Sequence, residues 1–143
     1  MKVRELMTNP VIRIHPEESV SVAARTLTHY NIGILPVCGS DGRLCGVVTD
    51  RDMVTRCLAA GRSPETTTVR EVMTAGIVAV APDMEASEAA ALMGGRQIRR
   101  LPVLENGRLC GMVSIGDLTR NTPTREEAAE ALADISSNLS SRR

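Results

Sequence analysis

Apolar residues recur in this chain with a helical period over a segment near the start of the sequence. Val20, Ala23, Ala24 and Leu27 follow the i, i+3, i+4, i+7 spacing that places side chains on one face of a helix. Ser19 precedes the first of them and is a residue type that caps helix N-termini. We therefore expect a helix that begins after Ser19 and packs this face against a core.

The same spacing occurs again later in the chain, at Ala86, Ala89, Ala90 and Met93. The pair Gly94–Gly95 follows directly, and glycine costs a helix about 1 kcal/mol relative to alanine. A second helix is expected here, and we expect the two glycines to weaken or end it.

Each predicted helix is followed by two short apolar runs that a turn sequence separates. In the first copy, Ile34–Cys38 and Leu44–Val48 enclose Ser-Asp-Gly, and in the second, Leu101–Leu104 and Leu109–Val113 enclose Glu-Asn-Gly. Asp-Gly and Asn-Gly between apolar runs are strong signals for a β-hairpin. Each copy is therefore expected to contain an antiparallel strand pair.

A short extended segment is expected before each of these helices, and another helix is expected after each hairpin. Val11–Ile14 and Ile77–Val80 have extended character and end before a proline-containing pair, and a residue that precedes proline avoids the helical region. The helix after the first hairpin is expected from about Arg51 to Ala60 and should stop at Gly61. Both copies thus read as β-α-β-β-α units.

The two copies are also similar in sequence. The sequence VRELMT at Val3–Thr8 returns as VREVMT at Val69–Thr74, and the tripeptide Leu-Pro-Val begins at both Leu35 and Leu101. A duplication over a long period is typical of repeat architectures. It predicts an α/β (α+β) protein of two pseudo-symmetric halves with paired sites.

The predicted boundaries follow from the repeat. We expect residues 1–61 to form the first repeat, residues 62–68 a polar linker that contains Pro64, and residues 69–122 the second repeat. Residues 123–143 are expected to form a C-terminal helix, over Thr124 to Leu139, with a frayed and flexible end from Ser136 onward.

Composition argues against several classes of function. With 17 basic and 17 acidic residues the net charge is zero, and Tyr30 is the one aromatic residue, so nucleic-acid binding is not expected. No apolar run approaches the length of a membrane span, and repeat sequence begins at the N-terminus, which leaves no room for a signal peptide. A cytoplasmic protein that binds neither membrane nor nucleic acid is expected.

The cysteines and the catalytic residue types give little support for an enzyme. The main interpretation of Cys38, Cys45, Cys57 and Cys110 is as small buried side chains, although Cys38 and Cys45 flank a turn and leave redox or metal sensing open. The chain has a single lysine and no phosphate-binding loop, and its two histidines are not spaced as a metal pair. We expect no enzyme activity and no resident metal.

A short polar motif ends each hairpin, and it has two interpretations. Thr49 is followed three residues later by Asp52, and Ser114 by Asp117. The pattern is typical of a capping box, in which hydroxyl and carboxylate satisfy free amides at a helix start. The same geometry places a hydroxyl and free amides where an anion binds, and a carboxylate where a ribose diol could donate to it.

The whole arrangement resembles the cystathionine-β-synthase (CBS) domain family, as a tandem pair that fills almost the entire chain. The resemblance is carried by the Met7–Thr8 and Met73–Thr74 openings, the two Leu-Pro-Val strands, and the phrases GVVTDRD and GMVSIGD. It is similar in particular to small stand-alone bacterial CBS pairs. This resemblance implies two repeats packed through their sheets and a disc-shaped homodimer.

The resemblance also implies a regulatory module that binds AMP, ADP, ATP or S-adenosylmethionine in clefts between the repeats and signals to a separate, unknown protein. The adenosine compound would be a regulatory ligand and not a required cofactor. In this family the motif acid holds the ribose, and the motif hydroxyl lies near ribose and phosphate. The positions that match are Asp52, Asp117, Thr49 and Ser114, with adenine expected against Thr8, Val11, Ile12, Thr74, Ile77 and Val78.

The two clefts are expected to differ in charge. Family members often carry a basic residue before the Leu-Pro strand, which here corresponds to Arg99–Arg100 in the second repeat, and Arg51 lies inside the first motif. The Asp52 cleft is therefore expected to bind phosphorylated ligand more tightly, through Arg51 and Arg100. The alternative for Arg99–Arg100 is that both are solvent-exposed residues at the start of a strand and bind no ligand.

A second class of function stays open, in which the clefts are degenerate and the chain is a structural module for dimerisation and protein interaction. Gly94–Gly95 and Gly116 favour that interpretation, because they would loosen the second half.

Overall fold

The computed structural model describes residues 1–9, 11–120 and 124–141, and the side chains as far as Ser137. The chain divides into two compact units, and each is described by itself. Unit 1 consists of Met1–Val11, Val78–Asn106 and Cys110–Arg143, and unit 2 consists of Ile12–Ile77 and Gly107–Leu109. The domain boundary expected between residues 122 and 123 lies outside the described residues.

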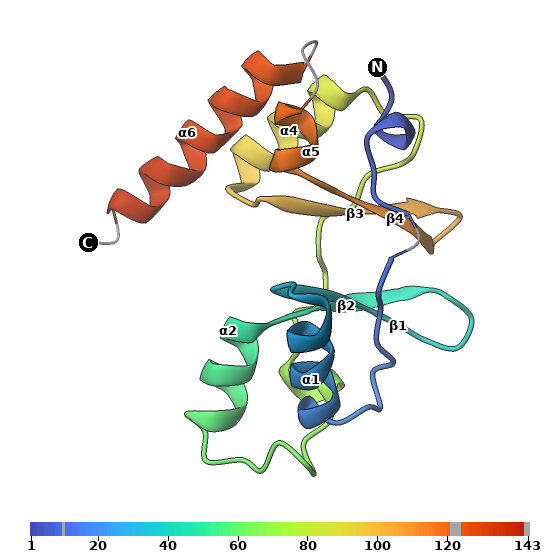
Figure 1. Ribbon diagram of the computed structural model, residues 1–143, viewed down its shortest axis with the longest axis vertical. Helices are drawn as coiled ribbons and strands as arrows, with labels where there is room; N and C mark the ends of the chain where they lie inside the picture. Colours follow the sequence, from blue (N-terminus) through green and yellow to red (C-terminus); the bar gives the residue numbers. More distant parts are fainter. Residues whose placement is uncertain (10, 121–123, 142–143) are drawn as a thin grey trace. The chain divides into compact units, whose positions relative to one another are not determined.

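Unit 2 is a two-stranded antiparallel sheet with helices on one face (Figure 1). Strands β1 and β2 pair in a register that sets Leu35 opposite Val48, with an irregularity after Val37. The extended segment before the first helix adds a single parallel bridge, from Ile14 to Val37. The elements are α1 (Val20–Tyr30), β1 (Ile34–Cys38), β2 (Leu44–Thr49), α2 (Asp50–Met53), the π-helical turn η2 (Val54–Leu58) and α3 (Val69–Val72).

The core of unit 2 lies between the helices and the sheet. The expected helix begins where the sequence predicted, because the Val22 amide donates to the Ser19 hydroxyl over 3.2 Å. Three of the four residues on its apolar face are buried. The buried side chains of this core are Ile14, Val20, Ala23, Leu27, Leu35, Val37, Val48, Met53, Cys57, Val69 and Val72.

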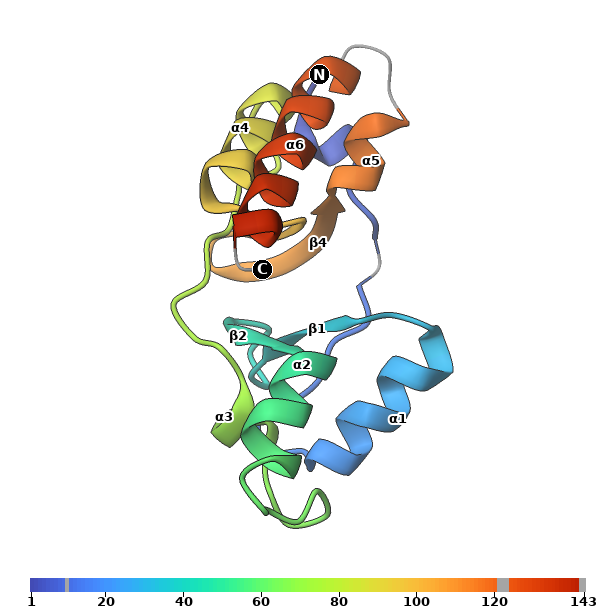
Figure 2. The same ribbon diagram turned by 90° about the vertical axis from the view of Figure 1, so that its left-hand side faces the viewer.

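Unit 1 repeats this plan and adds a long helix. Figure 2 shows α6 running alongside α4, and α6 also packs against α5. The second hairpin again forms a two-stranded sheet, of β3 and β4. Val80 adds a parallel bridge to Val103, as Ile14 does to Val37 in unit 2. The elements are the 3-10 turn η1 (Val3–Glu5), α4 (Ala86–Arg96), β3 (Arg100–Glu105), β4 (Arg108–Ser114), α5 (Ile115–Thr119) and α6 (Arg125–Ser141).

The opening segment of each repeat packs into the core that is built around the strands of the other repeat. Val3 of the first repeat is fully buried in the unit 1 core with Leu101 and Val113. Val69 and Val72 of the second repeat are fully buried in the unit 2 core. The compact units therefore do not coincide with the repeats as they are ordered along the sequence.

The helix α4 includes both Gly94 and Gly95 and ends one residue later, at Arg96, so the glycines do not stop it at their own positions, and their expected weakening of the helix stays a prediction. A Cβ atom at Gly94 would lie 3.1 Å from the Ala131 Cα of α6 and 3.0 Å from the Asp134 Oδ2. Glycine thus allows α6 to approach closely, and the packing of Ala128 and Ala131 offsets the lower helix propensity. Gly94 therefore packs the second half closely against α6.

Alanine substitutions at the two glycines should have opposite effects on stability. Gly94→Ala should destabilise the protein by about 1–2 kcal/mol, because the new methyl group forces α6 away. Gly95 has no neighbouring atom within 4 Å of an added Cβ. Gly95→Ala should therefore stabilise by about 0.5–1 kcal/mol, through helix propensity alone. Urea denaturation of both variants tests this, and equal effects would contradict the packing described for α6.

The C-terminal part of the chain is helical as expected, from Arg125 to Ser141. Its helix bounds reach past Leu139 and across most of the segment that was expected to fray, while residues 142 and 143 lie outside the described residues. Of the helices in the described ranges, none combines the length and the apolar character that a membrane span requires.

Candidate functional site

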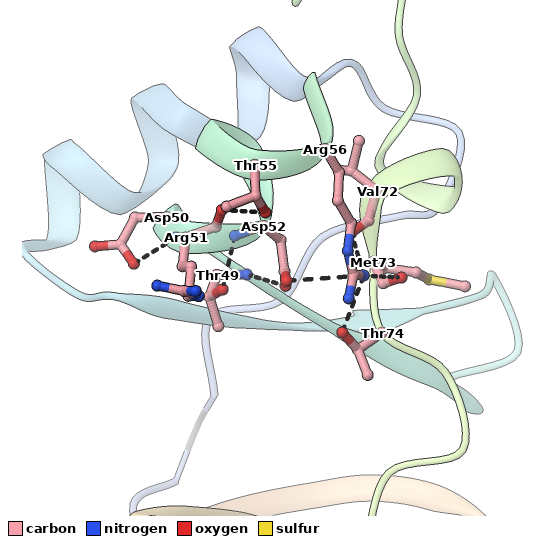
Figure 3. Close-up of polar contacts among 9 residues, drawn as sticks. All are labelled: Thr49, Asp50, Arg51, Asp52, Thr55, Arg56, Val72, Met73 and Thr74. Carbon is pink, nitrogen blue, oxygen red and sulfur yellow. Dashed lines mark hydrogen bonds and ion pairs between the residues drawn. The ribbon is translucent and has the colours of Figure 1, made fainter. Parts of the chain in front are cut away.

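The motif of unit 2 lies at the junction of β2 and α2, where Thr49 is the residue that caps the helix (Figure 3). The Asp52 amide donates to the Thr49 hydroxyl over 3.1 Å, and the Thr49 amide donates to Asp52 Oδ2 over 3.0 Å. The capping-box interpretation is therefore confirmed here. Asp52 retains only 9% of its surface exposed, so its carboxylate is held in a fixed and nearly buried position.

The motif of unit 1 has the same geometry at the junction of β4 and α5. The Asp117 amide donates to the Ser114 hydroxyl over 3.1 Å, and the Ser114 amide donates to Asp117 Oδ2 over 2.8 Å. Asp117 is 7% exposed. Two carboxylates with matching local environments thus occur in the two units, as the duplication of the sequence predicted.

In both motifs the cap occupies one carboxylate oxygen and leaves the other facing a cation. Asp52 Oδ1 lies 3.7 Å from Arg56 Nη1, and Asp117 Oδ1 pairs with Arg120. A carboxylate has about four lone-pair sites, so capping and acceptance of further hydrogen bonds are compatible. The two interpretations of the motif therefore do not exclude one another.

Arg56 and Arg120 are site residues that the motif analysis missed. A signal for them was present, because Arg56 follows Asp52 at i+4 and Arg120 follows Asp117 at i+3. Acidic and basic residues at these spacings are neighbours on a helix surface. What the spacing does not reveal is the further reach of Arg56 toward the segment that begins the second repeat.

Arg56 binds that segment at three points (Figure 3). Its Nη1 lies 2.9 Å from the Val72 carbonyl oxygen, 3.0 Å from the Met73 carbonyl oxygen and 3.1 Å from the Thr74 hydroxyl. Bonds from a charged donor are shorter and stronger than neutral ones. Arg56 therefore connects the Asp52 motif to residues 72–74.

Thr74 and Thr8, both predicted site residues, lie beside the motif strands. Thr74 exchanges main-chain hydrogen bonds with Val47 of β2, at 2.8 and 3.0 Å. Thr8 exchanges the equivalent bonds with Met112 of β4, at 2.7 and 3.2 Å. The structure thus brings Thr74 together with the Asp52 motif and Thr8 together with the Asp117 motif.

The remaining apolar site candidates lie where the chain passes from one unit to the other. Val11 ends the first segment of unit 1 and Ile12 begins unit 2, while Ile77 ends that stretch of unit 2 and Val78 resumes unit 1. Ile12 packs on the unit 2 core and Val78 on the unit 1 core. All four are half-buried, which leaves part of each side chain open to a ligand.

The three arginines expected to bind phosphate are exposed. Arg51 belongs to unit 2, and its amide donates to its neighbour Asp50 over 2.8 Å. Arg99 and Arg100 belong to unit 1, at the start of β3, and the Arg99 carbonyl accepts from the Ile115 amide over 2.9 Å. Because they belong to different units, the joint action of Arg51 and Arg100 stays a prediction.

The cysteines are all free thiols, with Cys38 and Cys57 buried and Cys45 and Cys110 half-buried. Burial is thus confirmed in full for two of them and in part for the other two. Burial also raises the pKa of the Cys38 and Cys110 thiols, which keeps both protonated at neutral pH. Within the part of the chain that the structure describes, no three His, Cys, Asp or Glu side chains gather as a metal site would require.

Comparison with known proteins gives one family for both repeats. The family model for the CBS domain matches residues 3–59 and 69–123. CBS domain-containing protein YhcV of Bacillus subtilis is 39% identical over 134 residues, which cover 94% of each chain. Hypoxic response protein 1 of Mycobacterium tuberculosis is 38% identical over 120 residues, 84% of each chain.

Solved structures agree with this comparison. A crystal structure of hypoxic response protein 1 with two coordinated zinc ions has a TM-score of 0.80 at 36% identity, over 86% of this chain and all of that one. The CBS domain pair of protein MJ0100, in complex with 5′-methylthioadenosine and S-adenosyl-L-methionine, has a TM-score of 0.74 at 28% identity. That match covers 84% of this chain and 94% of the other.

Proposed function

Because the chain belongs to the CBS domain family, we propose that it is a regulatory module that senses an adenosine-containing ligand. The ligand binds in clefts between the two repeats, and the signal passes to a separate protein. The observation that supports this most is the duplicated motif acid, Asp52 and Asp117, whose second oxygen takes no part in the cap and lies beside an arginine. A related CBS pair binds 5′-methylthioadenosine and S-adenosyl-L-methionine.

The chemistry of the motif suits a ribose. The two adjacent hydroxyl groups of a ribose can donate to one carboxylate. Because the cap already fixes this carboxylate, it loses little conformational entropy when the ribose binds. Both acids are nearly buried, where the low local dielectric strengthens hydrogen bonds. Adenine packs against aliphatic side chains, which fits a chain whose single aromatic residue is Tyr30.

In this proposal the exposed arginines bind the phosphate groups of the ligand. In this proposal Arg51 and Arg100 serve the Asp52 site, and Arg99 is a further donor. Guanidinium binds phosphate through two parallel bonds, with about 1.5–3 kcal/mol for each charge-assisted bond. The Asp52 site should therefore bind a phosphorylated ligand more tightly than the Asp117 site.

The proposed module acts as a cytoplasmic homodimer without catalysis of its own. Ligand binding changes the population of conformations, which requires that the ligand bind one of them more tightly. The alternative functions are a structural interaction module with degenerate clefts and a cysteine-based redox or metal sensor. A zinc-containing relative makes metal analysis of the purified protein a necessary control.

Thermal unfolding in the presence of AMP, ADP, ATP and S-adenosylmethionine tests this proposal. A ligand present at about 100 times its dissociation constant should stabilise the folded protein by about 2.7 kcal/mol and raise the melting temperature by several degrees. Guanosine and free ribose phosphate are suitable controls and should give smaller shifts. An unchanged melting temperature with all four adenosine compounds would favour the structural module instead.

A further inference from the structure

Arg56 joins two parts of unit 2, and no described residue of unit 1 makes the same set of contacts. Its guanidinium lies between the motif acid Asp52 and residues 72–74, and it contacts both. The carboxylate lies 3.7 Å away, beyond hydrogen-bond length, so this contact is an ion pair. The three contacts to residues 72–74 are within hydrogen-bond distance.

The position of the second repeat that corresponds to Arg56 is 121, which lies outside the described residues, and the arginine that pairs with the motif acid of unit 1 comes one position earlier. Arg120 pairs with Asp117, but its side chain is 72% exposed. Among the described residues of unit 1, no hydrogen bond joins Arg120 to the Met7–Thr8 segment, which is held by main-chain bonds between Thr8 and Met112. The two motif acids thus have matching caps and different outer partners.

The segment that Arg56 holds leads directly to the passage between units. After Thr74 the chain turns at Gly76, which has a φ of +65°, and leaves unit 2 at Ile77. An added Cβ at Gly76 would meet no atom within 4 Å, so the turn is not confined by neighbouring side chains. Among the described hydrogen bonds, the contacts of Arg56 and the Val47–Thr74 bridge are the last before the chain enters unit 1 at Val78.

We propose that Arg56 is a positioning residue that couples occupancy of the Asp52 site to the segment from Val72 to Ile77. This inference rests on the proposed function and names the side chain that transmits binding at one of the two sites. A ribose on Asp52 leaves the carboxylate ionised and displaces water from beside its ion pair with Arg56, which strengthens the attraction for the guanidinium. The more strongly held guanidinium in turn restrains residues 72–74, whereas at the Asp117 site no described hydrogen bond gives Arg120 such a connection.

Hydrogen exchange measured by mass spectrometry tests the coupling, with AMP as the probe. The AMP concentration is chosen for each variant from its dissociation constant, measured by calorimetry, so that every protein is saturated. In the wild type, AMP should slow exchange in peptides that cover residues 72–78 by about tenfold. Arg56→Gln should lose most of this protection at full occupancy. Arg120→Gln is the matched control and should keep it, and Arg56→Lys, which retains the charge, should keep part of it.

A measurement without ligand tests the restraint by Arg56 separately from ligand binding. Arg56→Gln should speed exchange of the Thr74 amide, which donates to the Val47 carbonyl over 2.8 Å, by about tenfold, while Arg120→Gln leaves it unchanged. Full AMP-dependent protection in saturated Arg56→Gln would overturn the coupling and leave the proposed function intact. Absence of binding by the wild type to AMP, ADP, ATP and S-adenosylmethionine would overturn both.

Discussion

Gly46→Ala is expected to destabilise the protein by about 3–4 kcal/mol, a large part of the stability of a typical domain. Gly46 lies in β2, and an added Cβ would come within 3.0 Å of the Thr74 carbonyl oxygen. That oxygen belongs to the backbone and accepts from the Val47 amide over 3.0 Å, so it cannot move without loss of the bridge. Urea denaturation followed by circular dichroism measures the loss.

Gly111→Ala is the matched control in the other unit. An added Cβ there would come within 3.0 Å only of the flexible Met7 side chain, and the nearest backbone atom, the Thr8 carbonyl oxygen, would lie 3.1 Å away. Methionine adapts to irregular space, so the expected loss is about 1–2 kcal/mol. If Gly46→Ala proves no more damaging than Gly111→Ala, the close approach of residue 74 to β2 is not as described.

Asp52→Asn is expected to weaken AMP binding about 30- to 100-fold with little effect on the fold. Asparagine keeps a carbonyl oxygen that can accept from the Thr49 amide, so the helix cap survives. What is lost is the charge that strengthens the two hydrogen bonds from the ribose, at a cost of about 1 kcal/mol for each bond, which is the difference between a charged and a neutral acceptor. Isothermal titration calorimetry measures the change in affinity, and thermal unfolding checks the fold.

Asp50→Asn controls for charge removal at the same helix. Asp50 is exposed and lies two residues from Asp52, and its Oδ1 accepts only from the adjacent Arg51 amide among the described hydrogen bonds. Its replacement should leave AMP affinity within about twofold, as surface substitutions away from a site usually do. Equal losses in Asp50→Asn and Asp52→Asn would point to a general electrostatic effect and not to a ribose contact.

Local patterns predicted most of the secondary structure. The helical spacing after Ser19, the hairpin turns and the two capping boxes are short-range features, and the structure has all of them. The duplication predicted two similar units, and the resemblance to the CBS domain family is confirmed by the family match over both repeats. The helical spacing, the turns and the caps depend on residues within a few positions of one another, and the duplication is visible by comparison of the two halves. For that reason they could be predicted from the sequence.

Features that depend on distant residues were missed. Nothing in the pattern around Val3 or Val69 indicates that each packs with the strands of the other repeat. The close packing at Gly94 was missed for a similar reason, because the cost of glycine in a helix is local and the approach of Ala131 is not. The reach of Arg56 to Val72 spans 16 positions and likewise has no signal in the sequence.

Calorimetric titration of AMP into the wild type and into the double variant Asp52→Asn/Asp117→Asn tests the central claim most directly. We predict saturable binding by the wild type and its loss in the double variant, which unfolds with the wild-type cooperativity because both caps retain an acceptor oxygen. Undiminished affinity in a folded double variant would contradict the assignment of these two carboxylates to the ribose.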